Sequence, residues 1–206
     1  PLLFPWPNRI KDARFTFKGR TVQLKPNTRE GYAIHGLVRD KPWNVEEKGA
    51  SEEGAHLRVG LRSADFPAIE EQYPYPFKIK VNWLLREGTL ELRTRVLNVG
   101  NDTMPMGFGV HTWFMIPITP VGVRRDCSII VPADSYWELE EHGIGSGRNV
   151  PTGRRLPVDG PKWDLRKPKP LDFQLDDVLT DLRLEGGEST ARIYDPAADI
   201  TVLNSS

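Results

Sequence analysis

The sequence predicts an all-β fold, either a sandwich or a barrel, with little helix. Apolar and polar residues alternate with a period of two in residues 77–83 and again in residues 90–96, which is the pattern of strands with one buried face. No stretch keeps a 3.6-residue period beyond about three turns, the pattern expected of an amphipathic helix. Short apolar runs separated by turn residues fill much of the remainder. A chain of 206 residues is long enough to form one such domain.

The first part of the chain predicts an extended arm and then a hairpin. Residues 1–8 are rich in proline and aromatic side chains, which excludes a helix there and favours an extended segment that ends at Asn8 and Arg9. Residues 15–24 alternate on either side of Lys18-Gly19-Arg20, which is typical of a β-hairpin. A loop follows, and it contains the pair His35-Gly36.

The most regular pattern predicts a long hairpin with a third strand after it. Residues 77–83 and 90–96 are expected to pair as antiparallel strands around a turn at Glu87-Gly88. A polar turn then leads into the apolar residues 104–119. We expect these to complete a three-stranded meander that carries His111.

Beyond residue 120 the sequence predicts short strands joined by long irregular segments. The expected strands are residues 128–131, 136–139, 191–194 and 200–203. Residues 143–170 are rich in glycine, proline and charge, which predicts a loop. The glycine cluster Gly143–Gly147 follows no apolar strand and precedes no helical pattern, which argues against a phosphate-binding loop.

Composition excludes several classes of partner. Lys plus Arg and Asp plus Glu both number 28, so no net charge attracts nucleic acid or an anionic membrane surface. No apolar run reaches the roughly 18 residues that a membrane helix needs. The single cysteine, Cys127, cannot form an intramolecular disulfide and is expected to be a small buried side chain. These features predict a cytoplasmic protein, and they leave its oligomeric state open.

Four residues place a cationic or titratable group beside glycine, proline or a turn: Arg9, His35, His111 and Asp176. An imidazole can both give and take a proton near neutral pH, so two histidines in such places suggest acid–base chemistry. The Arg9 guanidinium is suited to holding neighbouring oxygens. Asp176, or Asp177 beside it, can accept hydrogen bonds from hydroxyl groups or can cap a turn.

Gly107 and Gly109, just before His111, allow two interpretations. A glycine inside a strand marks either a bend or a place where a ligand approaches the backbone closely. Other chemistries find no support, because the histidines and the lone cysteine lack the spacing of metal ligands. No Gly-x-Ser-x-Gly turn follows a strand, as a serine hydrolase of that type requires.

Five segments together resemble the aldose 1-epimerase (galactose mutarotase) family, in order and in spacing. They are Asn8-Arg9-Ile10, Ile34-His35-Gly36-Leu37, Met104-Pro105 leading through Gly107-Phe108-Gly109 to His111 and Phe114, Pro151-Thr152-Gly153, and Leu175-Asp176-Asp177-Val178. The resemblance covers essentially the whole chain. Its His-Pro-Tyr-Phe motif is present here as His111-Thr112-Trp113-Phe114, which keeps the histidine and an aromatic wall.

The resemblance implies a large antiparallel β-sandwich, the galactose mutarotase-like supersandwich, that binds a small-molecule aldohexose without a cofactor. His111 matches the family's general acid, which protonates the ring oxygen of the sugar. His35 matches a second histidine that hydrogen-bonds near that oxygen. Arg9, with Asn8 beside it, matches the position that holds sugar hydroxyls, and Asp176 matches an aspartate that binds them from the other side.

The resemblance also implies parts that these residues do not include. The general base of the family is a glutamate several strands beyond the aspartate motif, and we expect it beyond Ser206. Residues 1–206 are therefore expected to be a single mutarotase-like domain without its first and last strands. If these residues are the complete protein, we expect severely reduced activity or none.

Three alternatives stay open from the sequence. A hexose-6-phosphate 1-epimerase shares the fold but needs cationic groups for the phosphate, which Arg9, Arg29 or Arg39 can supply. A non-catalytic carbohydrate-binding β-sandwich can retain the site without the base. A structural domain with incidental histidines is the third.

Overall fold

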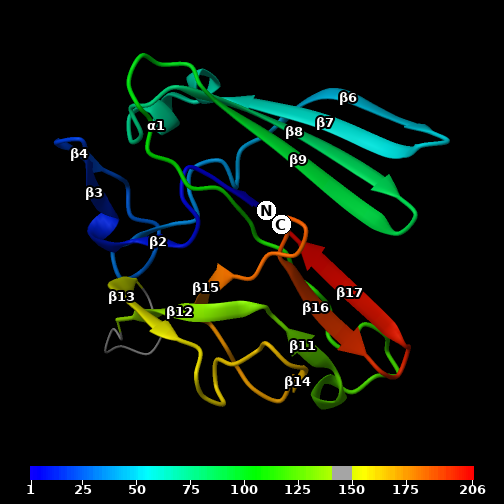
Figure 1. Ribbon diagram of the computed structural model, residues 1–206. Coiled ribbons are helices and arrows are strands. Elements are labelled where there is room, and N and C mark those ends of the chain that lie inside the picture. Colours follow the sequence, from blue (N-terminus) through cyan, green and yellow to red (C-terminus); the bar gives the residue numbers. More distant parts are fainter. Residues whose placement is uncertain (141–149) are drawn as a thin grey trace. The chain divides into compact units, whose positions relative to one another are not determined.

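The computed structural model describes residues 1–140 and 150–206. The chain divides into two compact units, Pro1–His111 and Thr112–Ser206, and each is described by itself (Figure 1). The prediction of one domain over residues 1–206 stays a prediction. The predicted glycine loop at Gly143–Gly147 falls within residues 141–149 and therefore lies outside the described residues.

The first unit consists almost entirely of strands. Its elements are β1 (Leu2–Leu3), β2 (Arg9–Ile10), the 3-10 turn Lys11–Ala13, β3 (Arg14–Phe17), β4 (Arg20–Gln23), β5 (Ala33–Ile34), β6 (Asn44–Ser51), β7 (Gly54–Arg62), the 3-10 turn Ser63–Asp65, α1 (Pro67–Glu70), β8 (Phe77–Arg86), β9 (Thr89–Asn98) and β10 (Gly109–Val110). β6, β7, β8 and β9 form a four-stranded antiparallel sheet in that order. The predicted hairpins β3–β4 and β8–β9 are confirmed.

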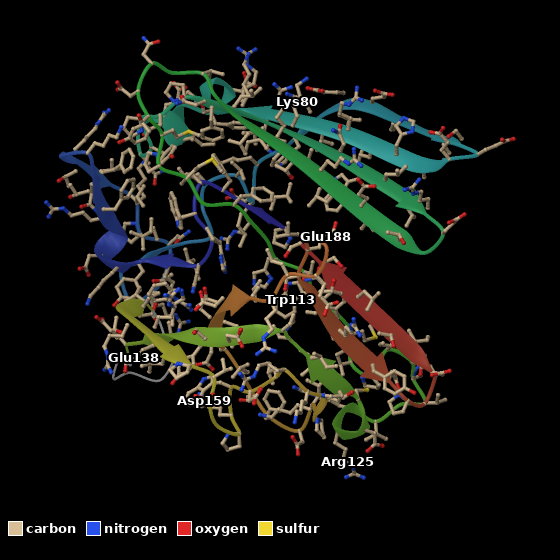
Figure 2. All side chains as sticks on the ribbon, in the orientation of Figure 1. Lys80, Trp113, Arg125, Glu138, Asp159 and Glu188 are labelled. Atoms are coloured by element: carbon tan, nitrogen blue, oxygen red, sulfur yellow. The ribbon has the colours of Figure 1, made fainter. Side chains whose placement is uncertain are left out.

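The core of the first unit lies against β8, as the alternation predicts. Phe77, Ile79 and Val81 are almost completely buried. The ring of Phe77 packs edge to face against Phe4 of the amino-terminal arm, with centroids 4.7 Å apart. Lys80 projects from the opposite face of β8 and forms an ion pair with Glu46 at 3.1 Å (Figure 2). One face of the sheet is therefore apolar and the other is charged.

The predicted three-stranded meander is wrong in its last strand. Of the apolar residues 104–119, only Gly109 and Val110 form a strand, and β10 pairs with β1 rather than with β9. The physical reason is the absence of side chains at two glycines. A Cβ atom at Gly107 would lie 2.8 Å from Pro7 and one at Gly109 would lie 3.0 Å from it. The bare backbone at these glycines lets the arm pack closely against this segment, and Leu2 and Leu3 of the arm, rather than β9, pair with β10.

The second unit is also built of strands. Its elements are the 3-10 turn Arg124–Asp126, β11 (Ser128–Ile130), β12 (Ala133–Leu139), β13 (Pro151–Pro157), β14 (Lys169–Pro170), β15 (Val178–Leu182), β16 (Thr190–Asp195) and β17 (Ile200–Ser205). They form the antiparallel sheets β14-β11-β16-β17 and β13-β12-β15. The four strands predicted here are present, but β13 and β14 lie in residues predicted as loop, and that part of the loop prediction is wrong.

Buried polar groups hold the second unit together. The carboxylate of Asp195 is completely buried and accepts hydrogen bonds from the backbone N–H groups of Ile118 at 2.9 Å and Ala197 at 3.0 Å. Cys127 is completely buried and unpaired, as predicted. On the surface, Glu138 of β12 forms an ion pair with Arg154 of β13 at 3.2 Å (Figure 2). The all-β prediction is confirmed, since the described elements are strands apart from the short helix α1 and the 3-10 turns. Every pairing between these strands is antiparallel.

Candidate functional site

The short pair β2–β5 brings Arg9 next to His35. Arg9 lies opposite Ile34 in this pairing, and the N–H of His35 donates to the carbonyl oxygen of Asn8 at 2.9 Å. Arg9 Nη1 in turn donates to Asn8 Oδ1 at 3.1 Å. Two segments separated by about twenty-five residues in the sequence are thus joined at one point of the first unit. The structure thus places Asn8, Arg9 and His35 together, and their roles toward a sugar stay predictions.

The backbone at this point is in the left-handed region. The φ angles of Asn8 and His35 are 56° and 64°, and that of Gly36 is 69°. Asn and His tolerate this conformation better than most residues, but a residue other than glycine adopts it only where its surroundings hold it there. The contact between Asn8 and His35 provides such a constraint.

His111 is held by the amino-terminal arm. Its N–H donates to the carbonyl oxygen of Pro1 at 2.8 Å, directly after the pairing of Val110 with Leu2. The arm also contacts the other histidine segment, since the N–H of Leu37 donates to Phe4 O at 2.7 Å. On the side where a Cβ would lie, Gly107 and Gly109 are approached by Pro7, so what these glycines allow here is close packing of the amino-terminal arm; a ligand contact there stays a prediction.

The two imidazoles lie edge to face. The ring centroids of His35 and His111 are 5.2 Å apart, and the ring planes are 89° apart. The pKa of His35 is lowered from its ordinary value, first by burial and then by the nearby His111, Arg39 and Arg9. Its Nδ1 atom is buried and has no hydrogen-bond partner among the described residues. The site thus offers a neutral imidazole beside a second, half-buried one.

The lowered pKa of His35 gives a testable pH dependence. We expect its imidazole to titrate below about 6.5, the value for an unperturbed histidine, and to be neutral at pH 7. Since the folded state binds this proton less well than the unfolded state, stability is fully present above the unfolded pKa and falls as the pH drops through the folded pKa. NMR titration of the His35 Cε1–H resonance measures this. A His35 pKa at or above about 6.5, the value for an unperturbed histidine, would contradict the expectation.

Asp176 belongs to the second unit and lies just before β15. Its side chain is exposed, whereas the carboxylate of Asp177 is 7% exposed and forms an ion pair with Lys162 at 3.5 Å. Lys162 in turn lies over the ring of Trp163, 4.5 Å from its centroid. Asp177 therefore has a structural partner, and Asp176 is the aspartate of the pair that is accessible to a ligand. Its role stays a prediction.

The hollows of the two units lie elsewhere. One of about 500 Å³ is lined by residues of β9 and of the loop after it, including Asn98, Asp102 and Met104. Another, of about 310 Å³, is lined by residues including Arg124, Arg125 and Phe173. Both are open, and neither is lined by Arg9, His35, His111 or Asp176. The site is therefore identified from the side-chain geometry around the histidines and not from a cavity.

Two further residues lie near the site: Arg39, which the sequence suggested only as a phosphate ligand, and Tyr73, which the sequence did not indicate. Arg39 contributes to the lowered pKa of His35. Tyr73 is buried, and its hydroxyl donates to the carbonyl oxygen of Pro105, six residues before His111. No sequence motif marks Tyr73, because its partner is a backbone atom.

Trp113, two residues after His111, is 83% exposed (Figure 2).

Two further features are absent from residues 1–140 and 150–206. These residues contain no group of three or more His, Cys, Asp and Glu side chains arranged to hold a metal ion. They also contain no helix long and apolar enough to cross a membrane.

The sequence and the fold both match known proteins. The family model for aldose 1-epimerase matches residues 1–206. Galactose mutarotase of Rattus norvegicus is 31% identical over 172 residues, which cover 82% of this chain and 45% of that protein. The uncharacterized protein YihR of Escherichia coli is 29% identical over 145 residues, covering 68% of this chain and 43% of that protein. The chain thus spans less than half the length of these two relatives.

Among solved structures, a galactose mutarotase-like protein from Clostridium acetobutylicum superposes with a TM-score of 0.82 at 23% identity. The superposition covers 98% of this chain and 60% of that one. This likeness confirms the predicted galactose mutarotase-like β fold.

Proposed function

Because the chain belongs to the aldose 1-epimerase family, we propose that the full-length protein interconverts the α and β anomers of a free aldohexose. Full-length protein here means the complete product of the coding sequence that contains these residues. The observation that carries the proposal is the pair of imidazoles of His35 and His111, which lie edge to face in the segments that resemble the family's motifs. Galactose and glucose are the proposed substrates, in line with the galactose mutarotases among the relatives.

The reaction needs two proton transfers, and imidazoles suit them. One group removes the proton of the anomeric hydroxyl while another donates a proton to the ring oxygen, and the bond between C1 and that oxygen breaks. Rotation of the resulting aldehyde and closure from its other face give the second anomer. We assign the donation to His111. His35, whose pKa is lowered by burial and by the neighbouring His111 and arginines, can hydrogen-bond to the sugar as a neutral imidazole.

The remaining roles concern binding and the base. Arg9, which Asn8 holds through its side-chain oxygen, is assigned to the sugar hydroxyls. Asp176, exposed before β15, is assigned to further hydroxyls. We propose that the general base is a glutamate in a part of the full-length protein that corresponds to the portion of galactose mutarotase not covered by this chain. This assignment predicts that residues 1–206 alone bind sugar but open its ring poorly.

Polarimetry with freshly dissolved α-galactose and α-glucose tests the proposal. We expect the full-length protein to speed the approach to the equilibrium rotation, and residues 1–206 alone to speed it far less. Isothermal titration with each sugar shows whether both forms bind. Binding without any acceleration by the full-length protein would overturn the enzymatic proposal and support the non-catalytic carbohydrate-binding alternative.

A second candidate is a hexose-6-phosphate 1-epimerase, and one observation favours it. Arg39 and Arg9 both lie near enough to His35 to lower its pKa, so two cationic side chains lie beside the site. A phosphate would be attracted to them, and added salt would weaken that attraction. Titration of glucose and glucose-6-phosphate at two salt concentrations distinguishes the candidates. Salt-dependent preference for the phosphate supports the second candidate, and equal affinity supports the free sugar.

A further inference from the structure

Tyr73 connects the core of the first unit to the segment that carries His111. It lies between α1 and β8, where its N–H donates to Ile69 O at 2.8 Å and its side chain is 1% exposed. Its ring packs against those of Tyr75 and Phe77, with centroids 5.0 Å and 6.2 Å away. From this fixed position the hydroxyl donates to the carbonyl oxygen of Pro105.

The segment from Pro105 to His111 depends on such contacts for its shape. It includes only a two-residue strand, β10. The N–H of Gly107 donates to Pro5 O at 2.7 Å and that of His111 to Pro1 O at 2.8 Å, so these two bonds come from the amino-terminal arm. The Tyr73 hydroxyl provides a third hydrogen bond, which links the carbonyl oxygen of Pro105 to the aromatic core. Burial and the neighbouring Tyr75 raise the pKa of Tyr73, so the hydroxyl keeps its proton at any pH at which the protein is active.

We propose that the Tyr73 hydroxyl is a positioning group for His111, which it fixes through the carbonyl oxygen of Pro105. This inference rests on the proposed function for its effect on rate, but its effect on the geometry of His111 is independent of that function. Proton transfer requires the donor and acceptor atoms to approach within about 2.6–3.2 Å. A displacement of about 1 Å in a catalytic group can cost on the order of a hundredfold in rate.

The test compares two substitutions that each remove one hydroxyl from the same aromatic cluster. Tyr73→Phe removes the donor to Pro105 and keeps the ring. Tyr75→Phe removes the hydroxyl of the neighbouring ring, and this hydroxyl makes no hydrogen bond in the described part of the chain. We expect Tyr73→Phe to lower kcat of the full-length protein about tenfold with little change in KM, the pattern of a displaced acid rather than of lost binding. Tyr75→Phe should change neither constant.

NMR separates a failure of this inference from a failure of the proposed function. In residues 1–206, Tyr73→Phe should shift and broaden the ring resonances of His111, whereas Tyr75→Phe should leave them unchanged. Unshifted His111 resonances in Tyr73→Phe would overturn the inference even if the enzyme is a mutarotase. Shifted resonances in a protein without mutarotase activity would support the positioning role and overturn only the proposed function. If Tyr73→Phe does not fold, the wild-type hydroxyl proton decides, since a rapidly exchanging proton would contradict the bond to Pro105.

Discussion

His111→Ala should slow anomerisation by the full-length protein by about 10²- to 10⁴-fold, the range that general acid–base catalysis typically contributes. The physical reason is that the leaving ring oxygen then departs without a proton from the protein, and water must supply it. The affinity for sugar should change much less, because Arg9, which we assign to the sugar hydroxyls, is unchanged and the His35 segment keeps its bond to Asn8. Rates come from polarimetry and affinities from isothermal titration.

His56→Ala is the matched control for this substitution. His56 belongs to the same unit, is half-exposed on β7 and contacts Glu47 at 3.3 Å on the charged side of the sheet. The substitution His56→Ala should leave the rate of anomerisation unchanged. Equal rates for wild-type protein and His111→Ala would remove His111 from the mechanism. A fall in rate for both histidine variants would point to a general loss of folding.

The sequence predicted best those elements whose apolar residues alternate strictly. In β8 the buried residues Phe77, Ile79 and Val81 determine both the strand and its face. β6 shows no such pattern because every residue from Asn44 to Ser51 is exposed, so it forms a strand only by pairing with β7. β7 does carry such a signal, because Leu57, Val59 and Leu61 alternate with His56, Arg58 and Gly60.

The site was predictable only in part. Glycine beside each histidine indicated unusual backbone, but composition and periodicity did not show that Arg9, His35 and His111 lie in one region. That arrangement depends on the proline-rich arm, whose backbone carbonyl groups receive hydrogen bonds from both histidine segments. Backbone acceptors leave no mark in a sequence. The resemblance to a family supplied what the local pattern lacked, and only the structure shows that Asp177 forms an ion pair with Lys162 whereas Asp176 is exposed.

Gly36→Ala should both destabilise the protein and weaken sugar binding. A Cβ atom at Gly36 would lie 2.1 Å from the carbonyl oxygen of Phe4, and the backbone there is left-handed with φ of 69°. The left-handed backbone costs about 1–2 kcal/mol for a residue with a side chain, and overpacking costs about 1–3 kcal/mol more. We therefore expect the free energy of unfolding to fall by roughly 3 kcal/mol. Because His35 directly precedes Gly36, the displaced backbone also moves the imidazole.

Gly19→Ala separates these two contributions. Gly19 has a left-handed backbone with φ of 79°, but no atom lies within 4 Å of the place where its Cβ would be. The free energy of unfolding of Gly19→Ala should fall by only about 1 kcal/mol, the cost of the conformation alone. This variant should bind sugar normally. Urea unfolding monitored by tryptophan fluorescence gives both free energies, provided that the m-value is unchanged. Equal losses of unfolding free energy for Gly36→Ala and Gly19→Ala would mean that the amino-terminal arm moves at Phe4 with no energetic penalty. In that case the close contact between the arm and the His35 turn does not hold the histidine in place.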